Sequence, residues 1–225
     1  MDNRQIEQKS TAIDIFLHLL QIVLLYAIIA SLIGLLFSLI SLYFPDALQS
    51  GRFILSSQNW AQAWITWNIT LLVVEFPLYI FIMWYLNKSY LASPFKREIK
   101  VRSSLIAFTL FLAALVIIGD MISLIYNFLR GELTLRFILK FLTVLVTASI
   151  AFGYYYLDLR RPESSLRKYL AYLSIAIVVV SIVVGFLIVG GPGQQRLLKF
   201  DEQKVRDLRT IQREIISYWQ SKGQL

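Results

Sequence analysis

The strongest constraint on this chain is a set of five long apolar runs separated by polar stretches. A helix rises about 1.5 Å per residue, so ~20 mostly apolar residues cross the hydrocarbon core of a bilayer. Each run reaches that length. The sequence therefore predicts an all-α, polytopic integral membrane protein with about five transmembrane helices, in a helical bundle over residues 12–189, at about 12–44, 60–86, 103–128, 134–157 and 169–189.

Composition agrees with a membrane protein and excludes several other classes. Hydrophobic residues make up 57% of the chain, above the ~45–50% of soluble domains. There is no cysteine, and His18 is the single histidine, so disulfides, thiol nucleophiles and multi-histidine metal sites within one chain are excluded. The net charge of +8 comes from lysines and arginines at the ends of apolar runs. We therefore expect contact with the lipid bilayer and no binding of nucleic acid.

The basic loops predict the orientation of the chain. Residues 87–104 and 158–168 are strongly basic, whereas the loops after the first and third spans are nearly balanced. Basic loops face the cytoplasm, so the N-terminal segment 1–11 is expected there. This segment has no signal-peptide pattern and is expected to be retained. We expect a bacterial-type cytoplasmic (inner) membrane, crossed several times, with the C-terminus extracytoplasmic.

Residues 190–225 are predicted to form a hinge followed by an extracytoplasmic amphipathic helix. Two glycines, a proline and a third glycine end the fifth span with a break. Apolar residues then recur at helical spacing, at Val205, Leu208, Ile211, Ile215 and Trp219. Such a face must be buried against the membrane surface, another part of the chain, or a partner.

The best candidate for a functional site is the acid Glu75 in the second span. An acid near the middle of a bilayer is costly in either protonation state. Pro77 lies two residues later, removes a helical hydrogen bond and crowds a carbonyl group. We favour Glu75 as a hydrogen-bonded tie between helices, and a proton or cation path is the alternative. Partners at a similar depth are His18, Gln21, Tyr154 and Tyr155.

Asp120 and Lys140 lie on either side of the short turn Arg130–Glu132. In an antiparallel hairpin the long lysine stem could reach the acid, so we favour an ion pair or a lysine that extends outward. An ion or substrate path that uses both residues is the alternative.

The remaining candidate, His18, shares one helix face with Asp14 and Gln21. We interpret this face as an interfacial polar stripe, with proton handling by the histidine as the alternative. Further along the same span, Ser31, Gly34 and Ser38 are small enough to let helices approach closely.

Recognisable catalytic and cofactor motifs are absent from the sequence. There is no nucleophile elbow, HExxH zinc motif, phosphate-binding Walker loop or dinucleotide-binding glycine motif. We therefore predict no catalytic, cofactor-binding or metal-ligating residues, and no cofactor.

Two stretches carry a resemblance to a known family. AIDIFLHLLQIVLLYAIIASLIGLLFSLISLYFPD, residues 12–46, resembles the first span of small bacterial multi-spanning membrane proteins grouped as a domain of unknown function. FDEQKVRDLRTIQREIISYWQSKG, residues 200–223, resembles the segment that follows in some of them. The resemblance implies a multi-spanning helical fold, and no activity, cofactor or partner.

The leading functional hypothesis is a non-enzymatic anchor or interaction module that presents its C-terminal helix to a protein partner or to the outer leaflet. The alternative is a small channel or transporter component that uses Glu75, Asp120 and Lys140. Five spans are few for a transporter, so this alternative requires a homo-oligomer. A lipid-modifying enzyme is a third hypothesis, supported only by the basic loops.

Overall fold

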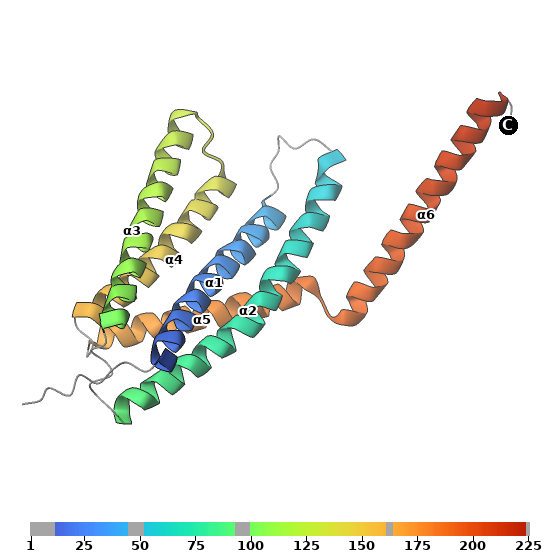
Figure 1. Ribbon diagram of the computed structural model, residues 1–225. Helices are drawn as coiled ribbons and strands as arrows, with labels where there is room; N and C mark the ends of the chain where they lie inside the picture. Colours follow the sequence, from blue (N-terminus) through green and yellow to red (C-terminus); the bar gives the residue numbers. More distant parts are fainter. Residues whose placement is uncertain (1–11, 45–51, 93–99, 161–163, 224–225) are drawn as a thin grey trace, which may run out of the picture. The chain divides into compact units, whose positions relative to one another are not determined.

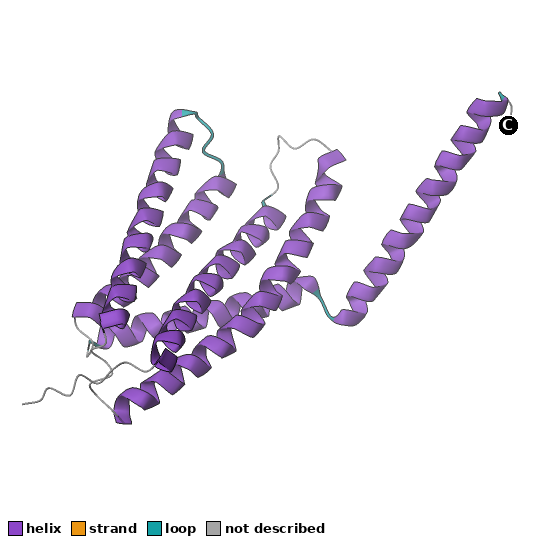
Figure 2. Cartoon of the chain, in the orientation of Figure 1, coloured by secondary structure: helices purple, strands orange, loops and turns teal. Residues whose placement is uncertain are grey.

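The structure of the protein is a computed structural model that describes residues 12–44, 52–92, 100–160 and 164–223. Nearly all of these residues are helical (Figure 2). The predicted cytoplasmic segment 1–11 lies outside the described residues. The helices are α1 (Ala12–Tyr43), α2 (Arg52–Ala92), α3 (Lys100–Leu129), α4 (Leu135–Arg160), α5 (Ser165–Val189) and α6 (Pro192–Lys222).

Five of these helices are long and apolar enough to cross a membrane. Their apolar segments, which agree closely with the five predicted spans, are Ile15–Tyr43, Gln62–Lys88, Ser103–Leu129, Leu135–Arg160 and Ser165–Val189. The helical fold class and the number of such helices therefore agree with the sequence prediction.

Helix α2 differs most from the sequence expectation. It spans 41 residues and begins at Arg52, so the polar loop expected to continue to residue 59 is helical over its second half. Pro77 lies inside the helix rather than at a break. A proline removes one hydrogen bond but leaves the other turns able to form, so a long helix can bend and continue. Figure 1 shows α2 curving along its length.

Helices α1 to α4, with α5 as far as Gly185, belong to one compact unit, and residues 186–225 form a second. Within the first unit α1 is central, because it contacts α2, α3 and α4, while α3 also packs against α4 (Figure 1). Buried apolar residues recur along α1 every three or four positions, at Leu24, Ile28, Leu32, Leu35 and Leu39. This spacing is one helix face, and it forms the core of the unit.

The outer faces of the first unit are apolar as well. Large apolar side chains more than a third exposed occur along all of its helices, including Phe81, Phe111, Leu142 and Val180. Soluble proteins rarely leave contiguous apolar surface of this kind in water. The fold therefore suits a lipid environment.

The second unit is dominated by α6, whose ends are marked by glycines. Gly190 has a positive φ of 76° and Pro192 opens the helix after the N-cap residue Gly191. The Gln195 side chain donates a 2.5 Å hydrogen bond to the Val189 carbonyl. At the other end Gly223, with φ 66°, donates its backbone N–H to Trp219. The chain is therefore interrupted at residues 190–191 and helical again from Pro192.

Candidate functional site

Glu75 on α2 faces α1, where the Ser31 hydroxyl donates a 3.2 Å hydrogen bond to its carboxylate. Ser31 is buried and Glu75 is partly buried. Ser31 was not among the partners considered from the sequence, which were chosen by depth alone. A contact of this kind is what the helix-tie interpretation of Glu75 predicts.

The same face of α1 brings α2 unusually close. A Cβ atom added to Gly34 would lie 2.7 Å from the Asn68 side-chain oxygen, so only glycine fits there without a shift of Asn68. Asn68 is buried and donates to the Trp64 carbonyl at 2.7 Å. The Ser38 hydroxyl donates to the Gly34 carbonyl. The small residues of α1 therefore do permit the close helix approach that the sequence predicts.

Asp120 and Lys140 are not brought together. Within the described residues neither takes part in an ion pair, and one carboxylate oxygen of Asp120 is buried without a hydrogen bond. The ammonium group of Lys140 instead lies 5.2 Å from the centre of the Phe37 ring on α1. The expected ion pair is therefore wrong, because Lys140 faces α1 rather than Asp120 on α3.

Arg136, one turn before Lys140 on α4, also faces α1. Its guanidinium donates a 2.9 Å hydrogen bond to the Ser41 hydroxyl near the end of α1. Both cations are partly buried. Arg136 was not singled out from the sequence, since the side of a helix that faces its neighbours cannot be read from the sequence.

His18 belongs to a polar cluster near the start of α1. It is only 4% exposed, so it is buried within the protein. The side chain of Asp14 lies outside the described part of the structure. Gln21, one turn along α1, donates to the Met83 sulfur of α2 at 2.9 Å. The structure thus places His18 and Gln21 in the bundle interior.

Tyr79 of α2 and Tyr155 of α4 extend this cluster across the bundle. The Tyr79 side chain lies beside both Gln21 and Tyr155. Tyr155 packs edge-on against Tyr154, with 5.2 Å between ring centres. It is 5% exposed, and within the described residues its hydroxyl makes no hydrogen bond of good geometry. The cluster therefore joins α1, α2 and α4 through polar groups.

An ion pair missed by the sequence analysis lies near this cluster. Arg167 at the start of α5 donates a 2.7 Å hydrogen bond to Asp158 at the end of α4. The Asp158 side chain is only 5% exposed. Opposite charges nine residues apart, at the end of α4 and the start of α5, were the available signal, but the segment was treated only as a basic loop.

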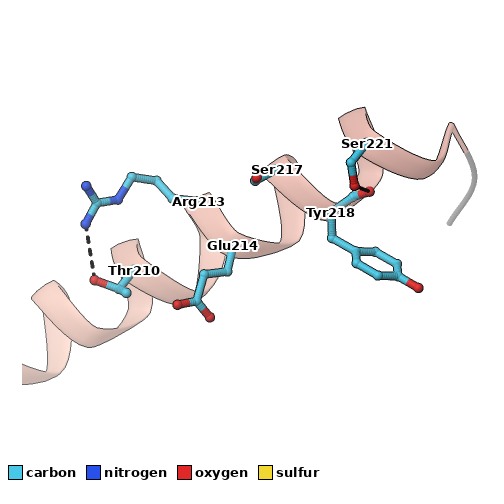
Figure 3. A pocket seen from close by; sticks show the side chains of 6 residues that line it. All are labelled: Thr210, Arg213, Glu214, Ser217, Tyr218 and Ser221. Atoms are coloured by element: carbon cyan, nitrogen blue, oxygen red, sulfur yellow. Dashed lines mark hydrogen bonds between the residues drawn. The ribbon is translucent and has the colours of Figure 1, made fainter.

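Helix α6 offers a different kind of surface. Figure 3 shows a strip along one side of it, in which Arg213 donates a 3.2 Å hydrogen bond to Thr210. The strip is open, and all its residues come from α6: Thr210, Arg213, Glu214, Ser217, Tyr218 and Ser221. It is too open to enclose a small ligand. Among the described residues no three metal-ligating side chains cluster together.

Comparison with known proteins adds one match. The sequence profile of the family described as Domain of unknown function (DUF5671) matches residues 14–155, more than half of the chain. The chain belongs to this family. The DUF5671 match contains His18, Glu75, Asp120 and Lys140, and it ends before Asp158.

The DUF5671 match confirms the resemblance to a family of unknown function and includes residues 14–46 of the first stretch. Residues 200–223, the second stretch, lie outside the match. No curated protein and no solved structure matches the chain.

Proposed function

We propose that the protein is a non-enzymatic integral membrane anchor that holds α6 on the membrane surface as an interaction helix. Helices α1 to α5 cross a bacterial-type inner membrane. The positive-inside rule places the N-terminus in the cytoplasm and α6 outside. The apolar face of α6 is covered by the lipid surface. Cover by a protein partner is the competing outcome of the test below.

The observation that carries this proposal is the exposed apolar face of α6. Val205, Leu208, Ile211, Ile215 and Trp219 follow helical spacing, and each is between 47% and 65% exposed. At ~25 cal/mol per Å² of apolar surface, covering such a face is strongly favourable. Helical spacing places the polar strip with Arg213 and Thr210 on the opposite side of α6.

Three features of α6 favour a lipid surface as the cover. The helix begins at Pro192, directly after α5 ends at Val189, so the end of a span leads straight into it. Its sequence has seven basic and four acidic side chains, a net charge of +3. The apolar side carries the aromatic residues Phe200 and Trp219. Basic faces combined with aromatic apolar faces are typical of helices that lie in the bilayer interface.

Spin labelling tests this proposal. The chain contains no cysteine, so a spin label attaches only to a cysteine that is introduced for the purpose. The full chain would carry one cysteine, at Ile215→Cys on the apolar face or at Ser217→Cys on the polar strip. In vesicles of anionic phospholipid, we expect the label at 215 to meet oxygen dissolved in the bilayer. The matched label at 217 should meet an aqueous nickel reagent instead.

Equal aqueous access at both positions would show that α6 stands free in water and would refute the proposal. Shielding of the label at 215 from both reagents would assign the face to a protein partner or a second copy. An impermeant maleimide applied to intact cells should modify Ser221→Cys, since we propose that α6 is extracytoplasmic.

A second candidate function is an oligomeric ion path, and Asp120 favours it. One of its carboxylate oxygens is buried without a hydrogen bond within the described residues, and unpaired acids inside spans often mark ion pathways. A second copy of the chain would have to supply the opposite wall. Ion flux in proteoliposomes that is lost in Asp120→Asn and kept in Asp120→Glu would support this candidate. No flux in the unchanged protein would exclude it.

A further inference from the structure

Two cations lie one helical turn apart near the start of α4, against the end of α1. Arg136 is held by its 2.9 Å hydrogen bond to Ser41. Lys140 is held over the Phe37 ring, 5.2 Å from its centre. Both cations are partly buried, and like charges four residues apart on a helix lie side by side and repel each other. The two side chains therefore form a concentrated positive site between α1 and α4.

This positive charge has no acidic partner within the described residues. The nearby Glu132 is engaged with Arg130, at 2.8 Å, on the exposed turn. The site also lies in the first turns of α4, where unpaired backbone N–H groups add a partial positive charge. Cations are disfavoured at that end of a helix, most strongly in the first turn, where Arg136 lies. Like charges and the helix end thus combine to favour an anion.

The position of the site along the helices indicates which anion can reach it. Arg136 is the second residue of α4, and Ser41 lies two residues before the end of α1 at Tyr43. If these helices cross the membrane, both residues lie at the level of the phospholipid headgroups. Lys140 lies about 6 Å deeper, at about 1.5 Å per residue. Phe37 provides an apolar contact beside the cations.

We propose that Arg136, Lys140 and Ser41 form a binding site for a phosphate group, supplied by the headgroup of an anionic phospholipid. The planar guanidinium can bind two phosphate oxygens at once, while the lysine acts as a point charge. The Ser41 hydroxyl already accepts from Arg136 and can donate its own hydrogen to a third oxygen. This site is separate from α6 and goes beyond the proposed anchor function.

Native mass spectrometry of the full chain in detergent tests the site. Phosphatidylglycerol, neutral phosphatidylcholine and inorganic phosphate would be titrated separately. We expect phosphatidylglycerol to bind most tightly. Since each basic residue near a membrane contributes ~1 kcal/mol, Arg136→Gln and Lys140→Gln should each weaken binding about fivefold. Lys140→Arg keeps the charge and should retain most of the binding.

The matched control is Arg130→Gln, which removes a cation from the same end of the bundle. Its side chain is 53% exposed and already paired with Glu132, so phosphatidylglycerol binding should not change. Unchanged helicity in far-ultraviolet circular dichroism would show that the variants fold. Loss of binding in Arg130→Gln to the same degree would overturn the site in favour of a general charge effect.

Three other results would also overturn the proposal. The first is unchanged phosphatidylglycerol binding in the double variant Arg136→Gln/Lys140→Gln. The second is equal affinity for inorganic phosphate, which would replace the lipid by a free anion. The third concerns Asp46, outside the described residues: if phosphatidylglycerol bound only after Asp46→Asn, that acid would already neutralise the site.

Discussion

The two ends of the first helical unit treat charge in opposite ways. At the α4–α5 end, Asp158 and Arg167 are joined at 2.7 Å, and the Asp158 side chain is almost fully buried. At the α3–α4 end, Arg136 and Lys140 contact a hydroxyl and an aromatic ring, and neither pairs with an acid among the described residues. The buried acid at one end is paired within the chain, whereas the two partly buried cations at the other end are left available to a ligand.

Chain connectivity explains part of this difference. Asp158 and Arg167 are only nine residues apart, at the end of α4 and the start of α5, so two consecutive helices bring opposite charges together. The turn between α3 and α4 also joins opposite charges, Arg130 and Glu132, but both remain about half exposed. Glu132 is therefore paired with Arg130 at the surface, and it forms no ion pair with Arg136 or Lys140.

The largest expected effect is at the paired end. Asp158→Asn removes the charge partner of Arg167 and should lower the free energy of unfolding by about 3 kcal/mol, because breaking a buried ion pair leaves an uncompensated charge. Unfolding of the purified protein by sodium dodecyl sulfate in mixed micelles would measure this loss.

The control for this variant is Glu132→Gln, which breaks the exposed pair with Arg130. Exposed pairs contribute at most about 1 kcal/mol, so this variant should change stability far less. Equal losses in both variants would show that the two ends do not differ in the way described.

The next largest effect is expected between the two ends and involves no charge. Gly34→Ala would place a methyl group 2.7 Å from the Asn68 oxygen. Such overpacking typically costs about 1–3 kcal/mol, although Asn68 can shift, so we expect a loss of about 1 kcal/mol. The change in the free energy of unfolding in this variant comes from packing alone, so the changes in the charge variants can be compared with it.

Gly119→Ala provides the matched control, since no atom lies within 4 Å of the added group. Alanine favours a helix over glycine by up to ~1 kcal/mol, so this variant should be neutral or slightly stabilising. A loss of stability at Gly119 as large as at Gly34 would contradict the close approach of α1 and α2.

The smallest effect is expected at the unpaired end. Lys140→Met loses a cation–π contact of about 0.5–1 kcal/mol, but it also relieves repulsion from Arg136 and the helix end. We expect the free energy of unfolding in lipid-free detergent to change by less than ~0.5 kcal/mol. A loss comparable with that of Asp158→Asn would indicate that Lys140 has a charge partner after all.

Long-range partners could not be predicted from the sequence, even where the residues themselves were correctly singled out. Glu75 was identified as unusual, but its contact with Ser31 depends on which faces of α1 and α2 meet. Asp120 and Lys140 were paired by depth alone, and the rotation of α4 directs Lys140 toward Phe37 instead. The depth of a residue in the membrane follows from counting residues along the helix. The helix that its side chain faces is decided by how the helices pack.

The sequence alone determined the five apolar helices, the glycine-bounded break and the amphipathic α6, because length, hydropathy and turn residues act locally. Only the tertiary structure decided that His18 is interior, that Asp158 pairs with Arg167, and that Arg136 and Lys140 share one face against α1. These outcomes depend on the rotation of each helix about its axis. That rotation is set by close packing across several helices at once, through contacts such as Gly34 with Asn68.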